Sequence, residues 1–402
     1  MDVLKLLAVL GVIVLAVNLK RPLYQAVLAA MVAVGFLFQM GFLNFFTQVL
    51  QGMINPDTWL VILAFYLIAY LQRMLERRGL TKLAQQSLGG LFNSRRVTVS
   101  LAPVFLGLLP APGVVPICGE IVEGTLGDDM KPVEKAFITT YYRHIPESFL
   151  PTFMAVLLGI KLSGTVSIRS FMITMLPMVG VLLALGYIFY LRRFNKETGA
   201  PPSTDKRSDA ISLFQSLWSI ALAVLLIVAF NLPVYLAVLV SIVLSAFVGR
   251  FTIFELGQLF LPAIETRLLL NTFCILVFKD VLSSTGAIER LPAVFEQLPI
   301  PQFLVFSLLF FFGGLMSGSQ AIVALCMPLA FATVKGAGAP LLVLLMGMTY
   351  AANQVSPTHV CLGISSEYFH VSIGALIKRT LPIMLIFMTV LHLYYLLLVQ
   401  FV

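Results

Sequence analysis

The sequence predicts an all-α polytopic membrane protein made of two inverted repeats, with about ten transmembrane helices and two re-entrant helical hairpins. Three observations lead to this fold class. Of the 402 residues, 59% are apolar and only 11% are charged, whereas soluble domains have roughly 45–50% apolar and about 25% charged residues. Long apolar runs alternate with short polar loops along the chain. Several features of the first half also recur in the second half.

The apolar runs are the candidate transmembrane helices, because a helix needs about 20 residues to cross a bilayer. The runs cover residues 3–18, 23–42, 58–74, 97–119, 136–160, 170–191, 211–230, 233–249, 269–284, 302–334, 340–366 and 380–399. No small-residue cleavage pattern follows the first run, so we expect a retained first helix. Residues 80–92 and 287–298 are mixed in polarity, which suits interfacial helices on the membrane surface.

Two stretches, 97–126 and 302–334, are predicted to fold back as re-entrant hairpins. The second has 33 residues and no formal charge. A single helix of that length would be about 50 Å long, too long for a hydrocarbon core of about 30 Å, and two full crossings would each be too short. The predicted tips have turn compositions, and they read Pro110-Ala111-Pro112-Gly113 and Ser317-Gly318-Ser319-Gln320.

A shift of about 207 residues aligns the two halves of the chain. The matches keep their order along the chain, and they are Arg21-Pro22-Leu23-Tyr24 with Leu232-Pro233-Val234-Tyr235, Gly79 with Gly286, and Gly107 with Gly314. Each match alone is weak, but the shared order and near-constant offset indicate a duplication. The predicted repeats are therefore residues 1–191 and 211–402, joined by the charged, Pro- and Ser-containing linker 192–210.

The basic residues predict how the chain lies in the membrane. With the N-terminus outside and both hairpins re-entrant, 19 of the 26 Lys and Arg residues are cytoplasmic, as the positive-inside rule requires. Both termini are then outside, the linker 192–210 is cytoplasmic, and the two halves have opposite orientations. We expect the protein in the cytoplasmic (inner) membrane of a bacterium or archaeon.

Two further apolar runs, 136–160 and 340–366, contain polar residues around a central proline. Because proline has no N–H group, Pro146 leaves the carbonyl of Tyr142 without its helical partner, and Pro357 does the same to Asn353. An ordinary proline kink is the simpler interpretation. However, the two prolines occupy equivalent places in the two halves and each has several polar neighbours. Such breaks persist in a bilayer where they are buried in protein or line a watery cavity.

The hairpin tips and helix breaks together predict a polar site near the bilayer midplane. Half-helix ends present free N–H groups, which suit an anion, or free carbonyls, which suit Na⁺. The candidate substrate-binding residues are Pro110, Ala111, Pro112, Gly113, Arg143, Ser148, Ser317, Gly318, Ser319, Gln320, Asn353, Gln354, Ser356 and Thr358. The stretches 317–320 and 353–356 are also candidate Na⁺ sites.

Four ionisable residues lie within the two breaks, where a charge in a spanning helix costs about 2.5–3.5 kcal/mol. Arg143 and Glu147 are four residues apart, so they either form a structural ion pair or leave Arg143 to bind a substrate carboxylate. The candidate ion-coupling residues are His144, Glu147 and His359. We expect His392, in the last helix, to serve in packing.

Several classes of function lack sequence support. The chain has no G-x-x-x-x-G-K-[ST] loop, so transport energy would come from an ion gradient or a separate subunit. It has no HExxH motif, which argues against a membrane hydrolase. The four cysteines show no CxxC or Cys/His metal spacing, so we expect buried apolar side chains, no resident metal and no cofactor. The basic residues lie in loops and do not indicate a nucleic acid partner.

This plan resembles the ion transporter superfamily, which includes gluconate, citrate, dicarboxylate and arsenite carriers. In that superfamily each half holds a re-entrant hairpin followed by an unwound helix, which here match 97–126 with 142–148 and 302–334 with 353–359. The chain is most similar to an uncharacterised family of ten-span bacterial and archaeal membrane proteins. The resemblance implies an elevator motion and a homodimer. Dicarboxylate/sodium members carry Ser-Asn-Thr at the tips, and this chain does not.

The leading hypothesis is therefore H⁺- or Na⁺-coupled transport of a small organic anion by a carrier that is not an enzyme. Its partners would be the anion and the lipid bilayer. A cation/proton antiporter is the alternative, and an intramembrane enzyme is a remote one.

Overall fold

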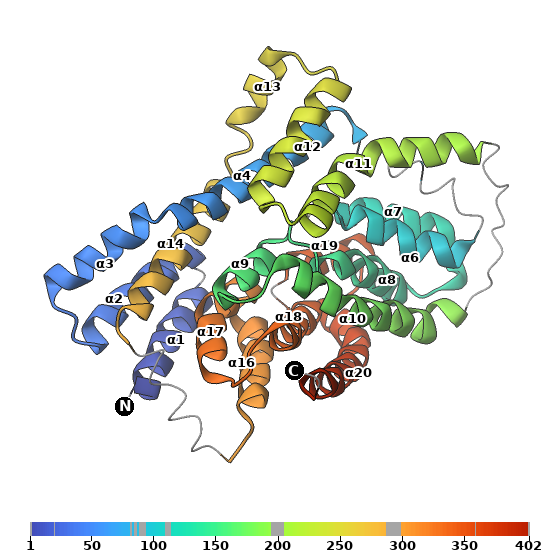
Figure 1. Ribbon diagram of the computed structural model, residues 1–402. Helices are drawn as coiled ribbons and strands as arrows, with labels where there is room; N and C mark the ends of the chain where they lie inside the picture. The colour runs from blue at the N-terminus through green and yellow to red at the C-terminus, as the bar shows by residue number, and fades with distance from the viewer. Residues whose placement is uncertain are drawn as a thin grey trace.

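A computed structural model describes residues 2–19, 21–80, 83, 87, 94–108, 114–193, 205–286, 299–357 and 359–400. The described residues form helices and connecting turns, with no strand among them. This confirms the all-α prediction for the described part of the chain (Figure 1).

The helices of the first half begin with four that are joined by short connections. They are α1 (Asp2–Asn18), α2 (Leu23–Leu37), α3 (Phe42–Ile54) and α4 (Pro56–Arg77). The helices that follow are α6 (Arg95–Leu106), α7 (Val114–Leu126), α8 (Pro132–His144), α9 (Met154–Ser163) and α10 (Ile168–Phe189). Short 3₁₀ turns cover Gly127–Asp129, Ile145–Ser148 and Leu191–Arg193.

The second half repeats this order of elements. Its first four helices are α11 (Lys206–Phe230), α12 (Val234–Val248), α13 (Ile253–Phe260) and α14 (Thr266–Ser283). They are followed by α16 (Gln302–Ser317), α17 (Ser319–Thr333), α18 (Ala339–Gln354), α19 (Val360–Tyr368) and α20 (Ile373–Val399). Each described helix of the first half therefore has a counterpart ten labels later.

The packing of the helices recurs in the same way. Helix α2 packs against α14, and α12 packs against α4. The paired helices α6 and α7 correspond to α16 and α17, and the second member of each pair contacts the opposite half: α7 contacts α19, and α17 contacts α9. Likewise, α8 contacts α20 and α10 contacts α18. The two halves are thus interlocked, and neither half packs as an independent domain.

Backbone conformations recur at matching positions too. Gly79 and Gly286 follow α4 and α14 and have φ angles of 65° and 64°, in the left-handed region that favours glycine. Gln39 and Arg250 follow the C-caps of α2 and α12 with φ angles of 53° and 49°.

The contacts at the ends of α4 and α14 are reciprocal. The Nδ2 atom of Asn55, the N-cap of α4, donates to Oδ2 of Asp280 in α14 at 3.1 Å. Conversely, Glu265, the N-cap of α14, lies 3.8 Å from the guanidinium of Arg73 in α4. Because the start of each helix meets the later part of the other, α4 and α14 are antiparallel.

The helices fall into two groups. The first four of each half pack mainly among themselves, and so do the later helices. Contacts between the two groups include α1 with α16 and α14 with α17. Figure 1 shows α2, α3 and α14 at the left and α12 and α13 at the top, while α8, α9 and α17 to α19 lie in the middle.

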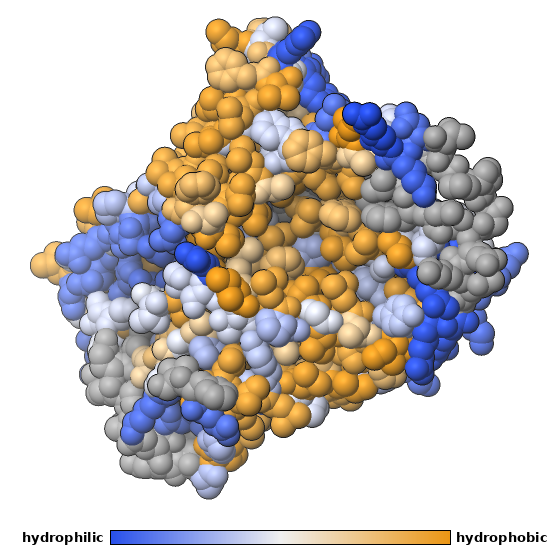
Figure 2. All heavy atoms as spheres, turned by 45° about the vertical axis from the view of Figure 1, so that its right-hand side comes forward, coloured by the Kyte–Doolittle hydropathy of each residue, from blue (hydrophilic) through white to orange (hydrophobic). Residues whose placement is uncertain are grey.

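The surface is apolar over a wide area. Figure 2 shows a broad hydrophobic face with hydrophilic residues gathered at its left and right margins. Four described helical segments are long and apolar enough to cross a membrane: Pro56–Arg77, Ile168–Arg193, Lys206–Phe230 and Ile373–Val399. The chain is therefore a multi-pass membrane protein. The other apolar helices have 10–17 residues, so the count of ten crossings stays a prediction.

The structure differs from the sequence-based expectations in two places. Helices α3 and α13 were not predicted, because their mixed faces, exposed for most of their length, have no continuous apolar run. Helix α11 begins at Lys206, inside the predicted linker, because the Asp205 carboxylate accepts from the Ser208 amide at 3.0 Å and caps the helix. The predicted interfacial helices 80–92 and 287–298 fall almost entirely outside the described residues.

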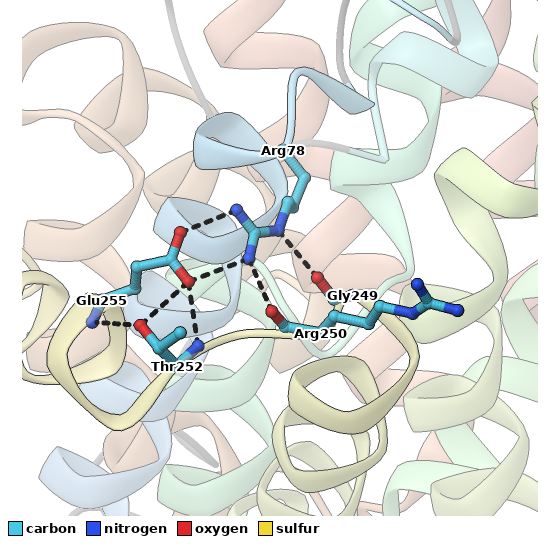
Figure 3. A network of polar contacts seen from close by, with 5 residues as sticks. All are labelled: Arg78, Gly249, Arg250, Thr252 and Glu255. Carbon is cyan, nitrogen blue, oxygen red and sulfur yellow. Dashed lines mark hydrogen bonds and ion pairs between the residues drawn. The ribbon is translucent and has the colours of Figure 1, made fainter.

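A polar network joins the end of α4 to the turn between α12 and α13 (Figure 3). Arg78 pairs with Glu255 at 2.9 Å and also donates to the carbonyls of Gly249 and Arg250 at 2.9 and 3.2 Å. Glu255 accepts from the Thr252 amide at 2.8 Å and so completes a capping box on α13. The Arg78 guanidinium, aided by this amide, lowers the pKa of Glu255 to about 2.

Replacing Arg78 with Gln should lower the melting temperature of the detergent-solubilised protein. The substitution removes the ion pair and leaves the end carbonyls of α12 without their cationic donor. Since the pKa of Glu255 is depressed, its contribution is complete above about pH 4.5 and is lost as the pH falls toward 2. The difference in melting temperature should shrink over that range. Arg77→Gln, at an exposed neighbour, is the control, and equal melting temperatures for both variants would contradict the expectation.

Candidate functional site

Helices α8 and α18 both stop inside the protein. Helix α8 ends at His144, a 3₁₀ turn follows over Ile145–Ser148, and α9 begins only at Met154. Helix α18 ends at Gln354, and α19 begins at Val360. The prolines explain both interruptions, because Pro146 and Pro357 lack the N–H group that would continue each ladder.

The helix break of the first half contacts the helix break of the second half. Nε2 of His144 lies 3.1 Å from Nε2 of His359, and their ring centroids are 4.9 Å apart. Nδ1 of His144 lies 2.6 Å from the carbonyl oxygen of Thr140. Since a carbonyl only accepts hydrogen bonds, Nδ1 of His144 carries a proton, and in the neutral ring Nε2 has a free lone pair. The lone pair faces His359.

An ion pair lies beside these histidines. Nη1 of Arg143 lies 2.7 Å from Oε1 of Glu147, and the same nitrogen lies 3.7 Å from Sγ of Cys361. Arg143 is only 1% exposed, so burying its charge requires close partners. The carboxylate of Glu147 is more exposed, at 19% of its side chain, and lies 3.9 Å from Nε2 of His144.

Gly107 fixes the position of Arg143. It is the C-cap of α6, and a β-carbon at this position would overlap the carbonyl oxygen of Arg143. Gly314, its counterpart in α16, packs against the β-carbon of Ala352, near the end of α18. In both halves a glycine therefore lets the first hairpin helix approach the end of the broken helix closely.

A cavity of about 210 Å³ opens beside the two breaks. Its walls come from both helix groups. The first group contributes Phe65, Ile68, Ala69 and Gln72 of α4 together with Glu265 and Leu268, and the second contributes Arg143, Glu147, Thr152, Phe153, Met154, Gln320 and Cys361. The cavity thus combines an apolar wall on α4 with a polar wall on the breaks and the hairpin tip.

The tip of the second hairpin is a single residue, Gly318, between α16 and α17. Its φ and ψ of 82° and 158° belong to a region that is essentially restricted to glycine. Next to it, Ser319 and Asn353 form a side-chain hydrogen bond at 3.0 Å. Ser356 donates to the carbonyl of Leu315 at 3.3 Å. The tip is thus tied to the second break.

Most of the predicted site residues that the structure describes come together here. Arg143, His144, Glu147 and His359 form one cluster, and Ser319, Asn353 and Ser356 surround the nearby tip. Ser148 and Ser317 instead donate to carbonyls of their own segments, at Ile145 and Gly313. Gln354 is buried. Pro110, Ala111, Pro112, Gly113 and Thr358 lie outside the described residues.

Several members of the site were not predicted from the sequence. Cys361 was expected to be an ordinary buried side chain, but its sulfur lies next to Arg143 and both histidines. A weak signal was present, since Cys361 follows His359 by two residues. Gln72, a polar residue near the end of a long apolar span, was a similar signal. Glu265 gave none, because its place in the cavity depends on the packing of α14 against α4.

The comparisons with known proteins identify a family and a similar fold. Residues 2–399 match the model of a family described as "Protein of unknown function (DUF401)". The chain belongs to the DUF401 family. No curated protein matches this DUF401 member. The YdaH transporter of Alcanivorax borkumensis, a crystal structure described as having an unusual topology, is similar with a TM-score of 0.61 and 15% identity. The alignment covers 89% of this chain and 88% of that one. Membership of the ion transporter superfamily stays a prediction.

Replacing Gly107 with Ala should disturb the site through the backbone of Arg143. A carbonyl oxygen cannot rotate out of the way as a side chain can, so we expect a loss of about 1–3 kcal/mol in stability. Thermal unfolding in detergent measures it. Gly124→Ala is the matched control, because nothing lies within 4 Å of the added carbon. If both variants melt together, Gly107 does not hold Arg143 in place.

Proposed function

We propose that this protein is a secondary active transporter that moves a small, carboxylate-like organic anion, coupled to H⁺ or Na⁺. One observation carries the proposal: the cavity at the two helix breaks is lined by a buried arginine and lies between two helix groups. Non-helical backbone at such depth is tolerated where it lines a cavity. The YdaH likeness supports a transporter fold.

Arg143 is the proposed anchor for the substrate. A guanidinium binds a carboxylate through two parallel hydrogen bonds, which gives both strength and orientation. The Thr152 hydroxyl, which also lines the cavity, is buried without a hydrogen-bond partner among the described residues. It can serve a second polar group of the anion. The apolar wall on α4 then faces the carbon skeleton. A volume of about 210 Å³ is below the roughly 300–1,000 Å³ of drug-sized sites, so the anion is small.

Glu147 is the proposed link between the anion and a proton. Its carboxylate neutralises Arg143 at 2.7 Å. A substrate carboxylate competes for the same guanidinium, and two carboxylates around one arginine favour protonation of one of them. Uptake of a proton by Glu147 therefore releases Arg143 for the anion. This competition couples anion binding to protonation.

The arrangement of the helices suggests how the site reaches both sides. We propose that the two halves are inverted repeats with ten crossings and two re-entrant hairpins, as the reciprocal contacts of α4 and α14 support. The later helices of both halves would move as an elevator against the first four. Both termini would lie outside, 192–210 would be cytoplasmic, and the protein would work as a homodimer in the cytoplasmic membrane.

Two features keep other coupling schemes open. The hydrogen-bonded Ser319 and Asn353, close to the end of α18, offer oxygen ligands suited to Na⁺. The contact between His144 and His359, with Glu147 nearby, favours cation/proton antiport as the second candidate function. Imidazole and carboxylate side chains are the groups that most often carry protons in exchange reactions.

Uptake assays in proteoliposomes test the proposal. A panel of radiolabelled mono-, di- and hydroxycarboxylates should identify a transported anion, with and without Na⁺ and a pH gradient. Arg143→Gln should reduce its uptake by about 100-fold or more, because a charge-assisted pair contributes roughly 3 kcal/mol. Glu147→Gln should retain uptake but lose its dependence on the pH gradient.

Arg77→Gln is the control for the loss of one positive charge at an exposed position. Wild-type anion uptake by Arg143→Gln would overturn the anion assignment. If that variant instead lost proton-coupled cation exchange while no anion was transported, antiport would replace it.

A further inference from the structure

We propose that His144, His359 and Cys361 form a binding site for a transition-metal cation such as Zn²⁺. The three residues come from both breaks: His144 ends α8, His359 is the N-cap of α19, and Cys361 lies in the first turn of α19. Their ligand atoms all lie within 4.8 Å of one another. Helices α8 and α19 pack against each other near the middle of the molecule (Figure 1).

The distance between the histidines suits a shared metal. Two imidazole nitrogens bound to one tetrahedral Zn²⁺ at about 2.0–2.1 Å are about 3.3 Å apart, and the two Nε2 atoms here are 3.1 Å apart. The sulfur needs to approach the two nitrogens by only a small side-chain rotation, because all three atoms are already within 4.8 Å. The geometry is therefore close to a ligand set before any metal enters.

The protonation of His144 also fits a metal ligand. Its Nδ1–H group donates to the carbonyl of Thr140 at 2.6 Å, which is the supporting contact that metal-binding histidines usually make through their second nitrogen. The free lone pair on Nε2 of His144 then faces Nε2 of His359. Two arrangements satisfy this contact: His359 donates a proton to His144, or both lone pairs face a cation. The sulfur of Cys361, whose position is within 4.8 Å of both histidine ligand atoms, favours the second arrangement, in which a cation is bound.

The ligand types select the class of cation. Thiolate and imidazole ligands suit Zn²⁺ and related transition metals, whereas Na⁺ and Mg²⁺ prefer oxygen ligands. Cys361 also lines the cavity, which gives a metal a route to the site. The carboxylate of Glu147, 3.9 Å from Nε2 of His144, or a water molecule can supply the fourth ligand.

Charge at the site is compatible with a divalent cation. The Arg143 guanidinium lies 3.7 Å from the Cys361 sulfur, so a metal would add positive charge near an existing cation. The thiolate of Cys361 and the carboxylate of Glu147 offset that charge. Metal binding releases the thiol proton of Cys361 to solvent, so apparent affinity should rise with pH.

Cobalt(II) and zinc(II) alone, added to the purified full-length protein after chelator treatment, test the proposal. We expect about one Co²⁺ per chain, with a near-ultraviolet thiolate-to-cobalt charge-transfer band that Zn²⁺ abolishes by displacement. Cys361→Ser should lose the band, and His359→Gln should weaken Co²⁺ binding by about tenfold or more. Cys326→Ser and His392→Gln, at a buried cysteine and a packed histidine outside this cluster, should bind as the wild type does.

The band surviving in Cys361→Ser would overturn the site. X-ray absorption of the zinc-loaded wild type gives a second measurement that needs no variant: one sulfur and two imidazole nitrogens are expected, and a shell without sulfur would refute the assignment. Organic-anion uptake by metal-free protein is measured separately, so failure of the metal site and failure of the proposed transport can be told apart.

Discussion

Backbone groups that leave a helix inside a bilayer must find their hydrogen bonds within the protein, and the architecture around the site follows from this requirement. At the ends of α8 and α18, proline interrupts the helical ladder. The break after α8 is closed by a 3₁₀ turn, and the Ser148 hydroxyl donates to a carbonyl of the same turn. The break after α18 is held by Ser356, which donates to the first helix of the hairpin. The surrounding helices therefore have to enclose both breaks.

The same enclosure makes the charges at the site costly. Arg143 is almost completely buried, and removing one partner of a buried ion pair typically costs several kcal/mol, while the pair itself adds little net stability. A buried pair at a cavity is therefore hard to explain by stability alone. The proposed substrate anion, which would exchange with one member of the pair, accounts for it. Gly107, which lets α6 approach the carbonyl of Arg143, helps to position this ion pair.

The two helix groups meet at the cavity, where the proposed relative motion would take place. The cavity takes its apolar wall from α4 and its polar wall from the breaks and the hairpin tip. The polar wall is internally bonded, since Ser319 and Asn353 join the tip to α18 and His144 meets His359. The α4 wall contributes mainly apolar side chains, which can slide past a ligand without breaking hydrogen bonds. Relative motion of the groups would therefore disturb few polar contacts.

The membrane class, the positions of both helix breaks and the turn at Gly318 could be predicted from the sequence, because composition, proline and glycine act locally on the chain. The sequence also aligned Gly79 with Gly286, and both adopt the same left-handed conformation. Only the packing of distant segments brings Nε2 of His144 against Nε2 of His359, 215 residues away, and places Cys361 beside them. The same packing places Glu265 in the cavity and holds α3 and α13 as helices. These features depend on which distant segments pack together, and packing is set by the shapes of all the helices at once.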